Sequence, residues 1–401
     1  MNVAPNLVHP NQAGFMKGRK IEDQVKLAKF LLNYAEAVEE NGIIVALGQE
    51  KAYDRINHTY MLRVLEHMGF PPKFCNTVKS LYTNAETIVM INGEMSEPFF
   101  VTRGVRQGDP LSCLLFNLAI EPLACLLRNS DLKGVKIPRK NPSLIASLFA
   151  DDTTVYLSSE DSLDILWSIL PLWCAASTAK FNEHKTVLLP FGKPKYRAKV
   201  LRERRINDEM PIGAIHESLR IIPDGQTCRM LGAWIGNSVP NITPWPSVLE
   251  KIAKDFERWK ASAPTLEGKR HIINMVIGGR TQYLTRVQGM PKDVEHTLVK
   301  TEHIFLWDGK KARVGHETMI LDISEGGKQI MDITSRNEAI DLWNLQSYLK
   351  HGDERASWCY FVDHILAKFL ELSYLNLRPF FYKTFMYQFL RELHCQMKSS
   401  G

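Results

Sequence analysis

Two adjacent carboxylates in the middle of apolar sequence constrain this chain more than any other feature. Asp151-Asp152 separates two apolar arms within residues 144–157, a pattern that predicts a β-hairpin with the acids where the arms meet. Neighbouring carboxylates repel each other unless a cation offsets their charge. Hard divalent ions such as Mg²⁺ take oxygen ligands and keep bound water, so such a turn is a candidate metal site near phosphates. The alternative is an acidic hairpin turn that only faces solvent.

Composition places the chain among ordinary globular proteins. Its 401 residues are 45% hydrophobic and 23% charged, which excludes collagen-like, coiled-coil and wholly disordered proteins and suggests two or three domains. The longest apolar stretch, 114–127, is interrupted by Asn117, Glu121 and Pro122 and is shorter than the ~18 residues of a spanning helix. The N-terminus lacks the basic-then-apolar pattern of a secretory signal. We expect a soluble, non-secreted protein.

Cysteine usage and net charge add two weaker expectations. The seven cysteines are scattered, and none has C-x-x-C or zinc-finger spacing, which favours buried thiols in a reducing compartment. The net charge of +6 and the pI of about 8.8 are compatible with a polyanionic partner without requiring one.

The first half of the chain alternates helical and strand-like patterns. Apolar spacing predicts a helix through 25–35, and the glycine-bounded apolar run 42–47 predicts a buried strand. Asp109-Pro110 has the form of an N-cap followed by proline at the first helical position, so we expect a helix to begin there. Further predicted elements are helices over 62–68 and 72–81, and a hairpin over 87–101 that turns at Asn92-Gly93.

The second half is mostly helical. A strongly basic stretch, 192–205, precedes the short strand-like element 231–236. Amphipathic spacing then predicts helices over 249–259 and 268–288, which places a domain boundary near residue 240. A further helical region is expected over about 335–395, including the aromatic-rich stretch from Tyr374 to Tyr387 as helical core.

Two more segments could carry chemistry. Residues 104–112 place a guanidinium, an amide and a flexible glycine before a helix N-terminus, where backbone donors suit an anion or a base. The alternative is a capped helix after a loop, with Arg106 in solvent. Residues 47–55 follow the buried strand, where catalytic groups of open α/β sheets lie. This cluster could instead be a solvated loop with a weak pair between Asp54 and Arg55.

The order of these segments resembles a reverse transcriptase, in particular that of non-LTR (LINE-type) retrotransposons. The resemblance covers about residues 6–345 and is specific in combination. The matching segments are Asn11-Gln12-Ala13-Gly14-Phe15 with Gly18-Arg19, Glu50-Lys51-Ala52-Tyr53-Asp54, Gly104 to Ser112, Phe149-Ala150-Asp151-Asp152, Asn182 with Lys185-Thr186, Leu231 to Gly236, Glu267-Gly268-Lys269-Arg270 and Glu325-Gly326-Gly327.

The resemblance implies roles for particular residues. Asp151 would be a metal ligand, with Asp152 in support, in a two-metal nucleotidyl transfer. Tyr53 would be the steric gate against a ribose 2′-hydroxyl, and Lys185 would lie near the departing pyrophosphate, unless they are only a core aromatic and a surface lysine. Arg106, Gln107 and Gly108 would shape the nucleotide and template pocket. The residues expected at nucleic acid are Lys193, Lys195, Arg197, Lys199 and Arg202, with Gly232 and Trp234 in the hairpin at the primer end. The basic stretch could instead be a solvated connector.

One position departs from the family. An aspartate five residues before the gate should bridge both metal ions, and this chain has Gly48 there. Glycine has no ligand atom, and loss even of an outer-shell group costs ~10–100-fold at metal sites. Neither Glu50 nor Asp54 is expected to reach the same point without a backbone shift. The family also carries an endonuclease and first fingers strands upstream of the segment matched here.

We therefore expect an α+β fold: a right-hand polymerase palm, an antiparallel sheet with helices behind, with partial fingers and an all-α thumb. The expected limits are 1–40 for partial fingers, 41–240 for the palm with fingers segments, 241–300 for the thumb and 301–401 for a helical connector. The implied cofactor is Mg²⁺ or Mn²⁺, and the implied partners are an RNA template, a DNA primer and deoxynucleoside triphosphates, with no membrane, in the nucleus or cytoplasm.

The sequence allows three hypotheses on function. The first is an RNA-directed DNA polymerase impaired at Gly48, and the second is a polymerase-shaped module that binds RNA or RNA–DNA hybrid without extending it. The third is a decayed copy of an element without a selected function.

Overall fold

The computed structural model describes residues 3–371, which form two compact units. Of these residues, the first unit comprises 3–224 together with Tyr360–Ile365, and the second comprises Gly225–Cys359 and 366–371. Within residues 3–371, no helix is long and apolar enough to cross a bilayer. The limits of fingers, palm and thumb given above stay predictions.

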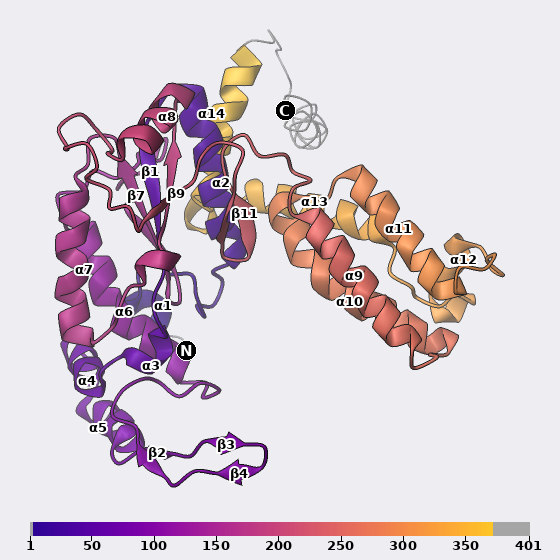
Figure 1. Ribbon diagram of the computed structural model, residues 1–401, viewed down its shortest axis with the longest axis horizontal. Coiled ribbons are helices and arrows are strands. Elements are labelled where there is room, and N and C mark those ends of the chain that lie inside the picture. The colour runs from indigo at the N-terminus through magenta and orange to yellow at the C-terminus, as the bar shows by residue number, and fades with distance from the viewer. Residues whose placement is uncertain (1–2, 372–401) are drawn as a thin grey trace. The chain divides into compact units, whose positions relative to one another are not determined.

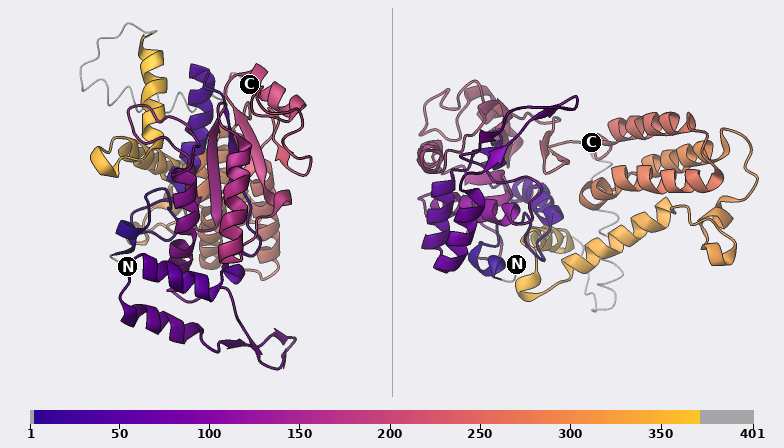
Figure 2. Two further views of the ribbon diagram at one scale, coloured as in Figure 1. Left: turned by 90° about the vertical axis from the view of Figure 1, so that its left-hand side faces the viewer. Right: turned by 90° about the horizontal axis from the view of Figure 1, so that it is seen from below.

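A five-stranded sheet in the order β6-β7-β1-β8-β9 is the framework of the first unit. Its strands are β1 (Gly42–Leu47), β6 (Ala146–Phe149), β7 (Asp152–Ser158), β8 (Val187–Phe191) and β9 (Arg220–Ile221). All neighbours pair antiparallel except β8 and β9 (Figure 2). The sheet with its surrounding helices confirms the α+β class.

The central strand β1 is apolar throughout because it is covered on both faces. Ile43, Ile44 and Val45 have no exposed surface, as expected for a strand with helices on either side. Helices α6 (Ser112–Arg128) and α7 (Leu163–Ser177) lie to one side of the sheet, and α2 (Ile21–Val38) lies to the other (Figure 1). The predicted strand over 42–47 and the predicted helix over 25–35 are both confirmed.

The predicted start of α6 is wrong by two residues. The helix begins at Ser112 rather than after an Asp109 cap. The Asp109 carboxylate instead accepts a hydrogen bond from the backbone N–H of Leu111 (2.8 Å), which turns the chain just before the helix. The remaining helices of this unit are α1 (Ala4–Leu7), α3 (Ala52–Arg55), α4 (His58–His67), α5 (Pro72–Tyr82), the 3₁₀ turn η1 (Glu183–Lys185) and α8 (Pro194–Glu203).

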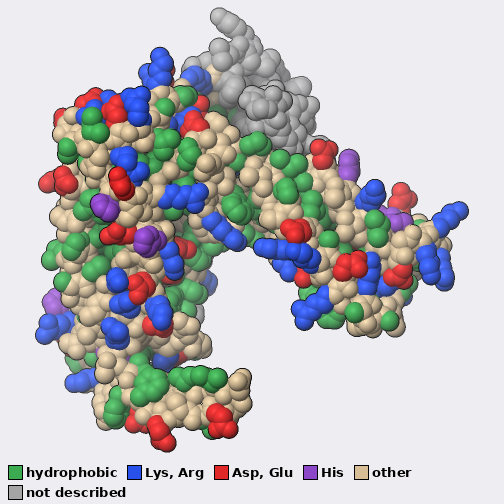
Figure 3. Space-filling model, viewed as in Figure 1, with side chains coloured by type: hydrophobic (Ala, Val, Ile, Leu, Met, Phe, Trp, Pro, Cys, Tyr) green, Lys and Arg blue, Asp and Glu red, His purple; other side chains and the backbone are tan. Residues whose placement is uncertain are grey.

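A hairpin turning at Asn92-Gly93 connects α5 to the segment before α6, as predicted. Its outer ladder joins β2 (Glu86–Thr87) to β5 (Phe99–Phe100), and its inner ladder joins β3 (Met90–Ile91) to β4 (Glu94–Met95). Hydrophobic side chains of this hairpin lie on the surface (Figure 3).

The second unit contains a short hairpin followed by helices. The hairpin pairs β10 (Cys228–Met230) with β11 (Ala233–Ile235), so the segment predicted as strand-like is a turn followed by a strand. Phe256 and Phe305 stack with ring centroids 4.3 Å apart between two of the helices. The helical elements are α9 (Trp245–Lys260), α10 (Leu266–Gln288), α11 (Lys292–Trp307), α12 (His316–Ile320), η2 (Ile323–Glu325), α13 (Ile333–Tyr348), η3 (Gly352–Glu354) and α14 (Trp358–Glu371), of which Tyr360–Ile365 are assigned to the first unit.

These helices confirm the predicted helical character of 249–259 and 268–288, and of 335–395 as far as residue 371. The aromatic-rich stretch from Tyr374 to Tyr387 lies outside the described residues. Among residues 3–371, the six cysteines form no disulfide.

One buried acid of the second unit has no hydrogen-bonding partner. Glu302 in α11 is 1% exposed, and neither of its carboxyl oxygens accepts a hydrogen bond. The Nδ1 atom of His316 lies 3.9 Å from Oε1. Burial, reinforced by the charge of Asp332, raises the pKa of Glu302 to about 8. The carboxyl group is therefore protonated at neutral pH in the folded chain.

This acid makes the stability of the second unit depend on pH. The folded state holds a proton that the unfolded state releases above about pH 4.5. The stability therefore falls by up to about 1.4 kcal/mol per pH unit as the pH rises from about 4.5 to about 8. Glu302→Gln should match the native chain near pH 5 and exceed its free energy of unfolding at pH 7.5. Guanidinium unfolding at both pH values measures this, with the exposed acid of Glu317→Gln as control; an equal effect at both pH values would contradict it.

Candidate active site

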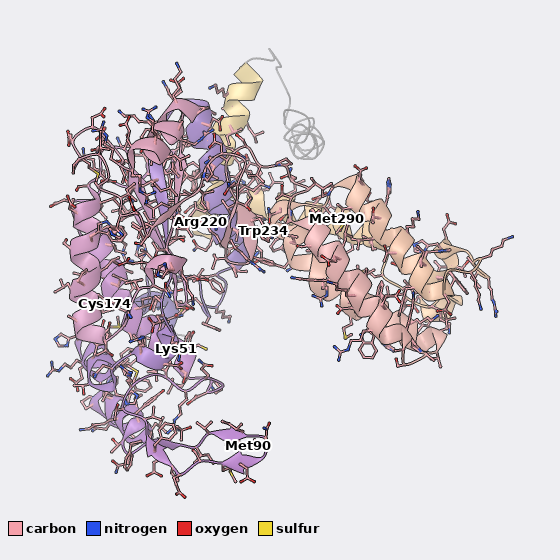
Figure 4. The ribbon with its side chains drawn as sticks, in the orientation of Figure 1. Lys51, Met90, Cys174, Arg220, Trp234 and Met290 are labelled. Atoms are coloured by element: carbon pink, nitrogen blue, oxygen red, sulfur yellow. The ribbon has the colours of Figure 1, made fainter. Side chains whose placement is uncertain are left out.

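The pairing of β1 with β7 brings the two acidic segments together. Leu47, the last residue of β1, pairs with Thr153, near the start of β7. One residue beyond the glycine that follows β1, the buried side chain of Gln49 donates a hydrogen bond from Nε2 to the carbonyl oxygen of Asp151 (3.0 Å). Lys51, labelled in Figure 4, continues the same loop. The exit of β1 and the 151–152 turn, predicted separately from the sequence, therefore lie side by side.

The acidic turn itself is held by a buried glutamine. Ala150 adopts a left-handed backbone conformation (φ 54°), and Asp152 is the first residue of β7. The Gln12 amide donates from Nε2 to the carbonyl of Ala150 (3.1 Å), and its Oε1 accepts from the N–H groups of Ala150 and Gly14 (both 2.9 Å). One side chain thus satisfies three backbone groups and fixes where the two acids leave the turn.

The segment that carries Gln12 lies along the edge strand β6. The N–H of Leu148 donates to the carbonyl of Asn11, and the N–H of Ala13 donates to the carbonyl of Leu148 (both 2.8 Å). At Gly14 a Cβ atom would lie 2.3 Å from the backbone nitrogen of Ala150, so only glycine allows this approach. This segment carries part of the family resemblance, but its sequence predicted no role for it. Nothing in its pattern indicates a partner so distant in sequence.

Arg19 stabilises the same segment from behind. Its guanidinium donates to four backbone carbonyls, those of Pro5, Val8, His9 and Gln12, at 2.7–2.9 Å. Arg19 is among the residues that carry the family resemblance, and in the structure its guanidinium organises this loop.

The surroundings of the Asp151 and Asp152 carboxyl groups offset their negative charge only in part. Burial raises the pKa of Asp151, while its own backbone hydrogen bond and the charge of Lys185 act in the opposite direction. Asp152 has an exposed side chain, but protein atoms crowd its carboxyl group, and this desolvation together with the charge of Asp151 raises its pKa as well. A cation bound between them would relieve this repulsion.

Gly48 faces the turn that carries Lys185. A Cβ atom at Gly48 would lie 2.4 Å from the Cβ of Lys185 and 3.1 Å from its carbonyl carbon. The carbonyl of Gly48 accepts from the N–H of Asn182 (2.7 Å), and the N–H of Gly48 lies 3.4 Å from Oγ1 of Thr186. The space that a side chain at position 48 would need is therefore taken by the backbone-proximal part of Lys185.

The neighbouring acids do not replace the missing one. Glu50 bonds to Arg55 (2.5 Å) and Lys180 (3.2 Å), and these hydrogen bonds lower its pKa. Asp54 accepts a hydrogen bond from Nε2 of Gln107 (3.3 Å). Within residues 3–371, no three His, Cys, Asp or Glu side chains gather so that they could hold a metal ion. The oxygen donors of Asp151 and Asp152 fit one hard cation with water completing its shell, and they lack the third carboxylate of a two-ion site.

Tyr53 has a packing partner. Its ring stacks on Phe116 in α6 with centroids 4.5 Å apart, and its hydroxyl is buried without a hydrogen-bonding partner. Burial, with smaller contributions from Cys113 and Asp151, raises the pKa of its hydroxyl. The ring is therefore rigidly held next to the acidic turn.

The segment before α6 lies beside the same loop. The N–H of Val105 donates to the carbonyl of Tyr53 (2.7 Å), which joins the two segments. Gln107 reaches Asp54 as described, and Gly108 is exposed beside it. Arg106 points to α5 instead: it donates to the carbonyl of Leu81 (2.8 Å), and its guanidinium carbon lies 5.7 Å from the centre of the Tyr82 ring.

The basic stretch lies at the other end of the sheet. Phe191, the end of β8, pairs with Gly42 at the start of β1, and α8 follows from there. The acids lie at the opposite end of β1, roughly 17 Å away along the strand. The ion pairs of this stretch are Lys193 with Glu39, Arg197 with Glu36 and Asp224, Lys199 with Asp208, Arg202 with Glu203, and Arg205 with Glu203 and Asp208.

Arg197 has a structural role. It is 4% exposed and donates to both carboxylate oxygens of Asp224 and to the carbonyl of Gly192. Lys195 and Arg202 remain exposed on α8. The structure therefore does not bring this stretch to the acidic turn.

Gly232 and Trp234 belong to the second unit. Leu231 and Gly232 form the turn between β10 and β11, and the hydroxyl of Tyr283 donates to the carbonyl of Leu231 (2.5 Å). The Gln288 amide accepts from the N–H of Trp234 (2.9 Å) and donates to its carbonyl (2.8 Å). These two hydrogen bonds resemble those of a neighbouring strand, and they join the hairpin to α10.

A cavity of about 450 Å³ lies behind the turn that carries Lys185. Leu47, Thr186 and residues of α7, including Leu170 and Cys174, line it. No local sequence pattern predicts this cavity, because its walls come from four separate segments.

The family is established by comparison. The chain belongs to the reverse transcriptase (RNA-dependent DNA polymerase) family, whose model matches residues 1–235. Reverse transcriptases typically use divalent metal ions.

The relatives are proteins of transposable elements. A 149 kDa protein of transposon TX1 from Xenopus laevis is 29% identical over 382 residues, which is 93% of this chain and 27% of that protein. A Pol polyprotein of the R2 element from Popillia japonica is 28% identical over 327 residues, 79% of this chain and 50% of its relative. The Pol polyprotein of element R2DM from Drosophila melanogaster is 29% identical over 193 residues, 48% of this chain and 18% of its relative.

These matches confirm the prediction of a reverse transcriptase domain of a non-LTR retrotransposon. The chain spans between about a fifth and a half of the lengths of these relatives. Among solved structures, telomerase from Candida albicans with a fragment of telomeric RNA matches with a TM-score of 0.33 and 10% identity, over 92% of this chain and 54% of that one.

The Gln12 clamp makes a prediction about stability. Gln12→Ala leaves three backbone groups at the acidic turn without partners, and each unsatisfied buried group costs about 1–3 kcal/mol. We expect the free energy of unfolding to fall by about 3 kcal/mol or more, measured by chemical denaturation. The exposed Gln346→Ala in α13 is the control, and an equally small effect of both variants would contradict the clamp.

The contact between Gly48 and Lys185 makes a second prediction. Gly48→Asp should destabilise the chain by about 1–3 kcal/mol, because overpacking forces the turn away. In a Lys185→Gly background, which removes the obstructing Cβ, the same change should cost about 1 kcal/mol less. A double-mutant cycle of unfolding free energies measures this coupling, and additive effects would show that the two positions do not collide.

Proposed function

We propose that this chain holds an RNA template paired with a DNA primer at the exit of β1, and that its nucleotidyl transfer is strongly impaired. The proposal rests on family membership for the substrate class and on one observation for the impairment: the Cβ of Lys185 fills the place that a side chain at Gly48 would need. Mg²⁺ or Mn²⁺ is the proposed cofactor.

The residues present would serve such a site in part. Asp151 and Asp152 would hold one ion, which would supply charge stabilisation at the phosphates of an incoming deoxynucleoside triphosphate. Lys185 lies close enough to Asp151 for its charge to act on that carboxyl, in keeping with a role near the triphosphate. Tyr53 is rigidly stacked on Phe116, as a gate against a 2′-hydroxyl would need to be. Gln107 and Gly108 beside them would meet the template.

The impairment follows from the donor count. A reverse transcriptase uses two ions, one at the primer 3′-hydroxyl and one at the triphosphate. With Glu50 engaged by two cations and Asp54 turned to Gln107, two carboxylates remain for two ions. Loss of outer-shell groups already costs ~10–100-fold, and the absence of a bridging ligand costs more.

The second candidate function is binding of RNA–DNA hybrid without extension. The net charge of +6 favours binding to phosphates regardless of sequence. In the basic stretch this role would fall to Lys195, which is exposed, and to members of ion pairs, the exposed Lys193 and Arg202 and the half-buried Lys199, rather than to the buried Arg197. In the second unit it would fall to the hairpin of Gly232 and Trp234.

Primer extension on an RNA template with Mg²⁺ or Mn²⁺ tests the proposal. The native chain should extend the primer no faster than Asp151→Ala, because the two-ion site is incomplete. Gly48→Asp alone should not restore extension, because the added side chain meets Lys185. Clear extension by the native chain that is lost in Asp151→Ala would contradict the impairment.

Hybrid binding is measured on the same preparations. We expect the native chain and Asp151→Ala to bind a fluorescent RNA–DNA hybrid with affinities that fall as salt rises. No binding by either chain at low salt would contradict both candidate functions.

A further inference from the structure

The hairpin between α5 and α6 has no buried side chain. Every residue from Glu86 to Phe100 is exposed. Met90, Ile91 and Met95 are 70%, 67% and 67% exposed. The other large hydrophobic side chains exposed here are Ile88, Val89, Phe99 and Phe100. Seven such side chains lie within fifteen residues, and hydrophobic side chains are visible on this hairpin in Figure 3.

Such a hairpin is incomplete on physical grounds. Each of its two ladders joins strands of only two residues, and an isolated two-stranded hairpin is marginally stable in water. Exposed apolar patches of this kind mark interaction sites on soluble proteins. Met90 lies near the tip, away from the sheet of this unit (Figure 4).

The register pairs side chains across the hairpin. Cross-strand partners share a face, so Met90 lies beside Met95 in the inner ladder and Thr87 lies beside Phe99 in the outer ladder. Among the residues that the structure describes, the hairpin strands pair only with each other, so both outer edges offer free N–H and C=O groups. An extended segment could add to such an edge as a further strand.

The charge of the hairpin identifies the kind of partner. Glu86, Glu94 and Glu97 lie among the apolar residues, and residues 84–102 contain no Lys or Arg, although the whole chain has a net charge of +6. Three carboxylates repel phosphates and attract Lys and Arg. The same charges disfavour pairing with the hairpin of a second copy.

We propose that residues 86–100 are a docking surface for a polypeptide segment that adds to an edge as a β-strand and alternates apolar with basic side chains. Its apolar residues cover one face of the hairpin, and its cations meet the three glutamates. This inference does not rest on the proposed function, since it concerns neither the acidic turn nor the catalytic state of the chain.

The test uses the full chain and two synthetic probes: acetylated peptides of four Val-Lys or four Val-Glu repeats. The native chain should bind the Val-Lys peptide at least tenfold tighter than the Val-Glu peptide, with affinity that falls as salt rises. Hydrogen exchange should show amides of 86–100 protected on binding.

Two variants separate the contributions of charge and apolar surface. The triple change Glu86→Lys, Glu94→Lys, Glu97→Lys should reverse the preference between the peptides. The triple change Met90→Ser, Ile91→Ser, Met95→Ser should weaken binding of the Val-Lys peptide at least tenfold. Leu172→Ser, which removes a 62% exposed side chain from α7, is the matched control and should change nothing.

Four results would overturn the proposal. The first two are equal affinity of the native chain for the two peptides and an unchanged affinity of the apolar triple variant for the Val-Lys peptide. Another is a single-stranded RNA that protects the same amides more strongly than the Val-Lys peptide, which would make the hairpin a nucleic-acid site. The last is self-association of the native chain in sedimentation that the apolar triple variant abolishes, which would make it an interface between copies.

Discussion

The candidate site depends on the antiparallel pairing of β1 with β7. This ladder places Leu47 opposite Thr153, so the loop after β1 and the turn before β7 emerge at the same edge of the sheet. The ladder alone does not fix the turn, because Ala150 adopts a left-handed conformation that an alanine rarely takes. The buried amide of Gln12 holds this conformation from a distant segment, and Arg19 holds that segment. The position of the acids thus depends on two side chains that never touch them.

The same edge explains why the site is limited. Gly48 and the turn of Lys185 approach so closely that their backbones bond through Asn182. Position 48 has no side chain, so the turn that carries Lys185 packs closely against the end of the strand. A carboxylate restored at 48 would have to displace the turn toward the cavity behind it. Family membership therefore defines the class of the chain, and the proposed impairment rests on the packing at Gly48.

Much of the fold was predictable because its signals are local. The apolar run 42–47 and the Asn92-Gly93 turn are short-range patterns, and both were confirmed. The proximity of Asp151 to the strand exit was predictable from the order of the segments. The start of α6 was not, because the Asp109 carboxylate accepts from the N–H of Leu111, which precedes the helix, instead of capping the first turn.

The contacts that sequence reasoning missed join residues far apart in the chain. Gln12 and Ala150 are separated by 138 residues, and Arg197 and Glu36 by 161. No periodicity reports such pairs, so the basic stretch suggested a phosphate contact where the structure uses Arg197 as an internal ion pair. Exposure of the 86–100 hairpin was equally invisible, because an Asn92-Gly93 turn between apolar flanks predicts a hairpin without saying what covers it.

The most direct measurement is the number of Mn²⁺ ions that the chain binds, counted by electron paramagnetic resonance titration of the free ion. The account holds that Asp151 and Asp152 form a site for one ion beside a glycine that contributes no ligand. It predicts one bound ion per native chain and none at the same concentration in Asp151→Asn. Two bound ions per native chain, or one ion unaffected by Asp151→Asn, would contradict it.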